Sequence, residues 1–149
     1  LILKNLDSFL LDNVDLKKQN NKTPTYYPKR EPNDSLIDWN LDINKLERFI
    51  RAVTKPFNGA FSFINTEIII IYDSQVFDLI DFGYEDYDNG VVLEILSNKK
   101  FLVKANGGVL LVNSYESKHK IKKGDIMNNN NNSIKYFKYN DHGFFDLKE

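Results

Sequence analysis

The sequence predicts an α+β fold that is mainly β, in which a linker and one or two helices precede a small barrel of about five or six strands. Two patterns predict it. Up to residue 53, apolar residues recur at the helical spacings of three and four. From Ala60 onward, short runs of strand-forming residues follow one another, separated by Asn, Gly and Ser turns. Short strands at such regular intervals are typical of a small barrel.

Composition narrows the class of protein. The 149 residues are 42% hydrophobic and 13% aromatic, which suits a folded domain rather than a disordered chain. The sequence has no cysteine, which excludes disulfides, thiolate zinc sites and cysteine nucleophiles. The net charge of −1 lacks the basic excess that is usual in nucleic-acid-binding proteins. The longest apolar run, at residues 68–71, is far shorter than the roughly 20 residues of a membrane span. We therefore expect a cytoplasmic protein with no membrane partner.

A first amphipathic helix is predicted from Leu1 to about Val14, where apolar residues follow helical spacing. Its apolar face packs either on the core of this chain or on a partner surface outside it. A polar linker follows over residues 17–24.

The next segment supplies the candidate substrate-binding residues. Pro24 and Pro28 favour extended backbone before them, and successive side chains of an extended segment point to opposite sides. One tyrosine of the pair can therefore face protein while the other faces a ligand, although both could simply be packing anchors. The candidates are Tyr26, Tyr27, Lys29 and Arg30.

The second predicted helix covers residues 42–53, with Asn40 or Asp42 as its N-cap. Glu47 and Arg51 stand four residues apart and are expected to pair on its surface. Before it, Trp39 is expected to be a packing anchor whose indole N–H needs a partner, and Asp38 to order the turn.

Five strands are expected over residues 60–64, 67–72, 90–96, 101–105 and 109–115. Residues 73–89 are acidic and are expected to form a solvated loop, since their spacing does not fit an EF-hand. The basic run at residues 118–123 is expected to be a solvated loop, with anion contact as the alternative. Five asparagines at 128–132 form a low-complexity insertion, and the aromatic stretch after them is expected to close the barrel or lie against it.

No catalytic or metal-binding motif accompanies these elements. His119 and His142 lie outside any H-x-x-H pattern, and no nucleophile elbow, dinucleotide fingerprint or P-loop is present. The residues alone indicate a binding or supporting module.

Residues 26–63 resemble the C-terminal region of the 10-formyltetrahydrofolate-dependent formyltransferases, a family that includes methionyl-tRNA formyltransferase and the sugar-nucleotide N-formyltransferases. The resemblance continues to about residue 127. Ser35 and Asn58 depart from a common Gly and a common Pro of the family. The positions that carry the resemblance are Tyr27, Pro28, Lys29, Arg30, Pro32, Asp34, Ile37, Asp38, Trp39, Ile50, Arg51, Ala52, Pro56, Gly59, Ala60 and Phe61.

The resemblance implies a division of the chain and of the chemistry. Residues 1–32 would be the tail helix and linker of a catalytic domain that is absent here, and residues 33–149 an OB-like C-terminal domain. The absent N-terminal, Rossmann-like half would bind 10-formyltetrahydrofolate and carry the catalytic residues. We therefore expect no catalytic, cofactor-binding or metal residue on this chain and no activity from it alone. The catalytic half could also be encoded separately and pair with this chain through residues 1–14.

Three functions are open, of which the first two follow from the resemblance and the third is an alternative to it. The first is transfer of a formyl group to an amino-sugar nucleotide, favoured because acids outnumber bases over residues 33–127. In that case a tyrosine at 26 or 27 would stack on a base or ribose, and Lys29 or Arg30 would meet a diphosphate. The second is the tRNA-contacting domain of a methionyl-tRNA formyltransferase. The third is a stand-alone OB-like module for single-stranded nucleic acid.

Overall fold

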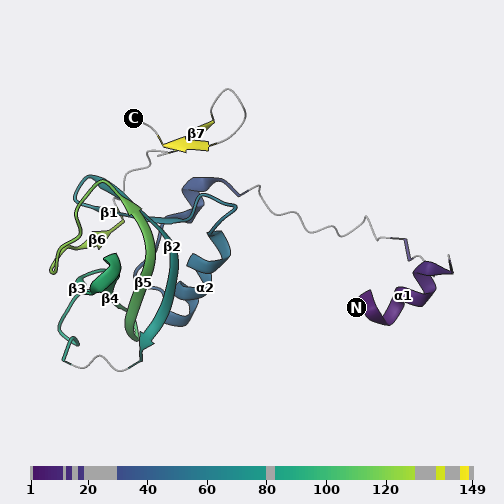
Figure 1. Cartoon of the computed structure of the whole chain (residues 1–149), viewed down its shortest axis with the longest axis horizontal. Helices are drawn as coiled ribbons and strands as arrows, with labels where there is room; N and C mark the ends of the chain where they lie inside the picture. The colour runs from purple at the N-terminus through teal and green to yellow at the C-terminus, as the bar shows by residue number, and fades with distance from the viewer. Residues whose placement is uncertain are drawn as a thin grey trace.

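The computed structural model describes residues 2–11, 13–14, 17–18, 30–79, 83–129, 137–139 and 145–147 (Figure 1). Two α-helices and two short 3-10 helices are present in these ranges: α1 (Ile2–Leu10), η1 (Pro32–Ser35), α2 (Ile43–Val53) and η2 (Ser97–Lys99). The strands are β1 (Ala60–Ile64), β2 (Glu67–Asp78), β3 (Val92–Ile95), β4 (Phe101–Ala105), β5 (Gly108–Ser117), β6 (Met127–Asn128), β7 (Phe137–Tyr139) and β8 (Phe145–Leu147). The predicted class, α+β and mainly β, is confirmed.

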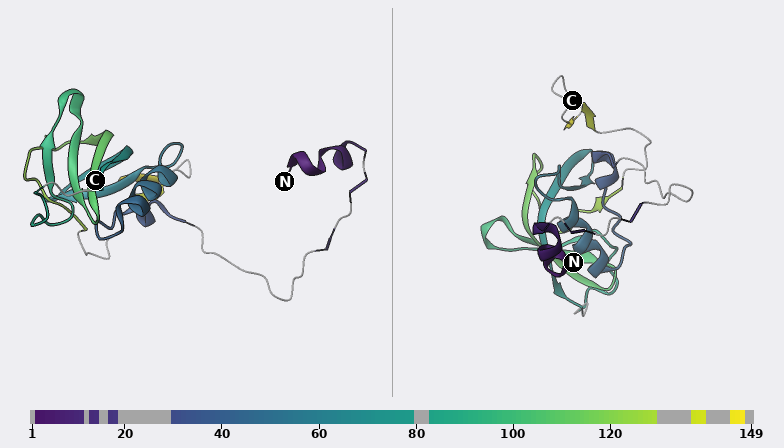
Figure 2. Two further views of the ribbon diagram at one scale, coloured as in Figure 1. Left: turned by 90° about the horizontal axis from the view of Figure 1, so that it is seen from below. Right: turned by 90° about the vertical axis from the view of Figure 1, so that its right-hand side faces the viewer.

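Six strands form one antiparallel sheet in the order β3-β4-β5-β2-β1-β6. Hydrogen bonds made by the segment around β6 join the two ends of this sheet, at β1 and at β3; we call this junction the barrel seam. On one side Ile64 pairs with Met127 in the β1–β6 ladder. On the other, the Met127 N–H donates to the Gly90 carbonyl and the Val92 N–H donates to the Asp125 carbonyl, each at 2.8 Å. The sheet therefore curls into a small barrel like that of an OB fold (Figures 1 and 2).

The barrel interior and helix α2 share one core. Side chains alternate along the strands, so that Val92, Val103 and Leu110 point inward and are fully buried. α2 packs against β2 and β5 with a stripe of buried residues at helical spacing (Figure 1). That stripe is Ile43, Leu46, Ile50 and Val53.

Helix α2 begins where its sequence predicts. The Asp42 carboxylate accepts hydrogen bonds from the backbone N–H groups of Asn44 and Lys45, at 3.1 and 3.3 Å. It thus satisfies two donors that have no partner within the helix. The Glu47–Arg51 pair also forms, at 3.5 Å.

The outer faces of the sheet carry two further apolar clusters. One lies on β3, β4 and β5, where Leu93 and Leu111 are buried and Tyr84 packs against them. The other lies on β1 and β2, where the rings of Phe61 and Phe63 meet edge to face at 5.9 Å. Both faces of the sheet are therefore apolar over much of their area.

The structure corrects the predicted loop at residues 73–89. β2 continues to Asp78, because the long strand β5 offers it partners as far as Val109. Register irregularities around Asp73 interrupt the alternation on which the prediction depended. Tyr84, also in the predicted loop, is partly buried and packs against the outer cluster that contains Leu93 and Leu111.

The two ends of the chain differ from the predicted arrangement. α1 is shorter than predicted, and its apolar side chains are exposed: Leu3 is 87% and Phe9 is 65% accessible. Packing of this helix on the chain's own core is therefore not observed. At the other end, the barrel is closed by β6, and β7 pairs with β8 in a separate two-stranded sheet. The expectation that an aromatic closing strand completes the barrel is wrong on this point.

Candidate functional site

The linker enters the barrel domain through a short turn that is fixed by its own side chains. The Glu31 N–H donates to the Asp34 carboxylate at 2.7 Å, and the Asp34 N–H donates to the Glu31 carbonyl at 3.0 Å. Beyond η1, the Ile37 N–H donates to the Phe61 carbonyl at 2.8 Å. Asp38 accepts the Asn40 N–H at 3.0 Å, which is the turn-ordering role that its position predicts. The junction between linker and barrel is therefore built from local hydrogen bonds within residues 31–40 and from one bond to strand β1.

Arg30 is the predicted site residue that the structure describes, and it is held at this junction. Its guanidinium lies over the ring of Phe49, 5.4 Å from the ring centroid, and donates to the Asp34 carbonyl at 3.1 Å. A guanidinium can stack on an aromatic face and donate in its own plane at the same time. Arg30 thus ties the linker to α2, whatever else it contacts.

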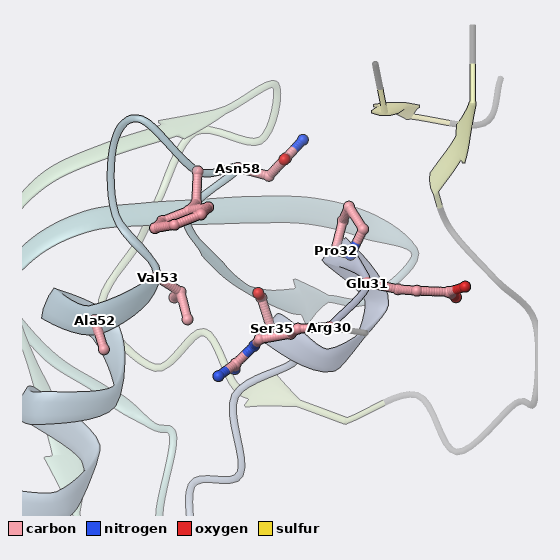
Figure 3. Close-up of a pocket in the computed structure, with 8 residues that line it drawn as sticks. Arg30, Glu31, Pro32, Ser35, Ala52, Val53 and Asn58 are labelled. Carbon is pink, nitrogen blue, oxygen red and sulfur yellow. The ribbon is translucent and has the colours of Figure 1, made fainter. Parts of the chain in front are cut away.

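The same residue borders a small hollow between η1, the end of α2 and the turn that leads to β1 (Figure 3). We call this hollow the junction pocket. Its volume is about 200 Å³ and its walls are mostly apolar. Pocket volumes for drug-sized ligands start at about 300 Å³, so it is too small for a whole nucleotide. The lining residues are Arg30, Glu31, Pro32, Ser35, Ala52, Val53, Phe57 and Asn58.

The other predicted site residues lie outside the described residues. These are Tyr26, Tyr27 and Lys29, whose substrate contacts stay a prediction. Arg30 is exposed, but both of its contacts are with the protein itself.

A second and larger hollow lies where β5 runs past β4. We call it the lysine groove. Its volume is about 820 Å³, and it is bounded by the turn at 95–99 on one side and by residues 113–121 on the other. Lys118 and Lys120 belong to the predicted basic run, but Lys99 and Tyr115 were not recognised as site residues. Periodicity cannot show that two turns far apart in the sequence border one groove.

Two tyrosines near this groove have altered acidity. Burial raises the pKa of Tyr115, whose ring meets Phe101 edge to face at 5.0 Å. Burial, and then the hydrogen bond from its hydroxyl to Glu116 at 3.1 Å, raise the pKa of Tyr72. Both phenols therefore stay protonated and can donate hydrogen bonds.

The described residues hold no set of groups suited to a metal ion: no three His, Asp or Glu side chains gather at one point among them. Nor does the described part of the chain include a helix with the length and apolar character that crossing a bilayer requires. Within this part of the chain, the junction pocket and the lysine groove are two hollows that could receive a ligand or partner.

Comparison with known families identifies the family to which the barrel and its preceding helix belong. Residues 29–131 match the formyl transferase C-terminal domain, which covers more than half of the chain. The chain belongs to this family. The match includes η1, α2 and the complete barrel, and thus also both hollows. The resemblance carried by residues 26–63 is confirmed.

Known relatives are much longer proteins. The chain is 41% identical over 81 residues to the bifunctional polymyxin resistance protein ArnA of Wigglesworthia glossinidia brevipalpis, covering 51% of this chain and 12% of that protein. It is 31% identical over 120 residues to methionyl-tRNA formyltransferase of Fusobacterium nucleatum subsp. nucleatum, covering 80% of this chain and 37% of that enzyme. The matched part of this chain thus corresponds to about an eighth of ArnA and to little more than a third of the methionyl-tRNA formyltransferase.

A solved structure shares the fold. The crystal structure of a HypX variant from Aquifex aeolicus superposes with a TM-score of 0.54 at 18% sequence identity, covering 79% of this chain and 20% of that one. At this identity the likeness establishes the arrangement of the strands and helices alone.

Proposed function

We propose that this chain is the C-terminal part of an N-formyltransferase that transfers a formyl group from 10-formyltetrahydrofolate to an amino-sugar nucleotide. An N-terminal Rossmann-like domain would bind the folate, position the amine and stabilise the developing oxyanion. The barrel would support that domain through the linker. The exposed apolar side chains of α1 suit a helix that packs on such a partner.

The charge of the barrel domain is the observation that carries the choice of substrate. Acidic side chains outnumber basic ones over residues 33–127. A domain that grips tRNA needs lysines and arginines against many phosphates, because neutralising phosphates supplies most of the affinity. A sugar nucleotide carries only two phosphates and makes no such demand.

A second candidate is the tRNA-contacting domain of a methionyl-tRNA formyltransferase. The similarity to the Fusobacterium enzyme of that name favours it, as do the lysines around the lysine groove. These lysines are few, and residues 83–89 on the same barrel carry carboxylates.

The full-length enzyme that contains this chain decides between the two. It would be incubated with 10-formyltetrahydrofolate and either UDP-, dTDP- and GDP-linked amino sugars or initiator methionyl-tRNA, with the formylated product measured by mass spectrometry. We expect product from one of the sugar nucleotides and none from the tRNA. Formylation of the tRNA alone would overturn the proposal. The 149-residue chain without the catalytic half should give no product from either amine.

The predicted linker contacts are tested in the same enzyme. Tyr26→Ala and Tyr27→Ala should differ, since only one of the two side chains can face the substrate. The expected result is a several-fold weaker affinity for the sugar nucleotide in one variant. Unchanged affinity in both would remove these residues from the site.

A further inference from the structure

The lysine groove exists because two neighbouring strands differ in length. The β4–β5 ladder ends at the pair Phe101 and Val112, whereas β5 continues to Ser117. β2 follows this extension on one side, with Ile71 opposite Tyr115. On the other side the turn at η2 takes the place of β4, and the resulting hollow is about 820 Å³. This volume is within the range of about 300–1,000 Å³ that is usual for ligand pockets.

Positive charge gathers at the mouth of this groove. The exposed lysines Lys99, Lys118 and Lys120 border it, from two different turns. None of the three has a hydrogen bond or ion pair with any described residue, unlike Lys123, which pairs with Glu94. Their ammonium groups are therefore available for an anion.

One carboxylate, that of Glu116, also lines the groove, and the carboxylate of Asp125 lies in the adjoining loop; both have hydrogen-bond partners. Glu116 accepts the hydroxyl hydrogen of Tyr72 at 3.1 Å. Asp125 contacts the His119 ring nitrogen at 2.8 Å and accepts the Lys122 N–H at 2.7 Å. These bonds also fix the course of the loop that carries Lys118 and Lys120. The lysines of this loop are exposed, as the predicted solvated loop requires, and its backbone is also held in place.

One wall of the groove is apolar. Ile95 and Leu96 are 44% and 38% accessible, although neighbouring strand residues are buried. An apolar wall beside a cluster of lysines matches a ligand that carries a flat, weakly polar ring next to phosphate. A long polyanion fits less well, because the acidic residues elsewhere on the barrel would repel its flanking phosphates.

We propose that the lysine groove binds a nucleoside diphosphate. The diphosphate would lie among the ammonium groups of Lys99, Lys118 and Lys120, and the nucleoside against Ile95 and Leu96. The choice of a nucleotide rests on the proposed function, because this ligand is the nucleotide half of a sugar-nucleotide substrate. The site would retain or sense that molecule on a domain separate from the predicted catalytic half.

The 149-residue chain labelled with ¹⁵N would be titrated with UDP, and its backbone amide shifts followed by NMR at about 0.15 M salt, where weak surface attraction is screened. Pyrophosphate, uridine and a single-stranded RNA oligonucleotide form the other arms. We expect UDP to shift the amides of residues 95–99 and 113–121. Pyrophosphate should bind more weakly at the same residues, and uridine should not bind measurably.

Three variants locate the ligand. The double variant Lys118→Glu and Lys120→Glu should weaken UDP binding at least tenfold. Ile95→Ser should weaken UDP but leave pyrophosphate unchanged. Lys45→Glu, on the exposed face of α2, reverses one charge away from the groove and should change neither. Thermal unfolding of each variant checks that the barrel remains folded.

Three outcomes would overturn the proposal. No shift in the groove with UDP would remove the site. Equal binding of UDP and pyrophosphate would mean that the nucleoside contributes nothing. Tighter binding of RNA than of UDP at these residues would assign the groove to nucleic acid. Each result is independent of the formyl-transfer assay, since that assay measures which amine the full-length enzyme modifies.

Discussion

The indole N–H of Trp39 donates a hydrogen bond to the hydroxyl of Ser62 at 3.0 Å, inside the protein. That hydroxyl in turn donates to the Asn128 carbonyl at 3.0 Å. One serine thus links the segment before α2, strand β1 and the closing strand β6. The partner that Trp39 needs comes from a residue 23 positions away.

Ser62→Ala should lower the free energy of unfolding by about 1–3 kcal/mol, because it leaves the buried indole N–H without an acceptor. Ser74→Ala is the matched control. Ser74 is also a buried strand serine, but its hydroxyl has no hydrogen-bond partner among the described residues, so its loss should be nearly neutral. Urea unfolding measures both. Equal losses in the two variants would show that the linkage through Ser62 contributes nothing.

Gly90→Ala should open the barrel seam. Gly90 has a φ of +91°, and a Cβ there would overlap the Met127 carbonyl oxygen. Gly83→Ala has a comparable φ of +82° with open space around it, so it carries only the backbone cost of about 1–3 kcal/mol. Thermal unfolding should show the larger loss for Gly90→Ala, and hydrogen exchange at the Met127 amide should accelerate in that variant alone. An equal loss of thermal stability in both variants would contradict the close contact between Gly90 and Met127.

Asp42→Ala should cost about 0.5–2 kcal/mol of stability, because two N–H groups of the first turn of α2 lose their acceptor. Asp42→Asn keeps an acceptor oxygen at the same place and should lose much less. Chemical unfolding of the two variants separates the cap from any effect of charge. A loss in Asp42→Asn as large as that in Asp42→Ala would point to the charge instead.

Stability should fall at alkaline pH through Tyr72. Burial and the bond to Glu116 raise the pKa of the folded phenol above its ordinary value of 10.0, so the folded chain keeps this proton to higher pH than the unfolded chain. The resulting stabilisation is complete below pH 10 and is lost as the pH rises through the folded pKa. Unfolding measured from pH 8.5 to 11 should show a shallower decline for Tyr72→Phe than for the exposed control Tyr87→Phe. Identical slopes would rule out this role for Tyr72.

Arg30→Ala should lower stability by about 0.5–2 kcal/mol, since it removes both the contact with the Phe49 ring and the bond to the Asp34 carbonyl. Arg30→Lys should recover only part of this, because an ammonium group lacks the flat surface that stacks on Phe49. Full recovery by lysine would mean that charge alone holds the linker.

Local signals in the sequence predicted the parts of the fold that local physics decides. Asp42 caps α2, and Phe101–Ala105 forms a strand, because a cap and a short apolar run bounded by turn residues are both signals contained within a few residues. The extension of β2 to Asp78 could not be predicted, because only pairing with the distant β5 makes acidic residues part of a strand. The closing role of β6 was missed for the same reason, since two residues have no period.

The candidate site residues likewise include some that local sequence identifies and some that only the tertiary structure brings together. Arg30 was recognisable from its place in a family pattern, but the stacking on Phe49 that occupies it depends on how the linker meets α2. The lysine groove joins Lys99 to Lys118 across a gap that only the unequal lengths of β4 and β5 create. Sequence reasoning identified the basic run but not the partner turn that makes it a site.

The closing strand β6 lies at the start of the five-asparagine run. The last barrel pairing is made at Asn128, at the start of the five-asparagine run. The described ladders of the six-stranded sheet therefore include only the first asparagine of that run. Since the described ladders of this sheet use no residue after Asn128, we expect changes in the length of the run beyond that position to leave the strand register unaltered. Unequal numbers of asparagines in otherwise similar proteins would leave this domain unchanged.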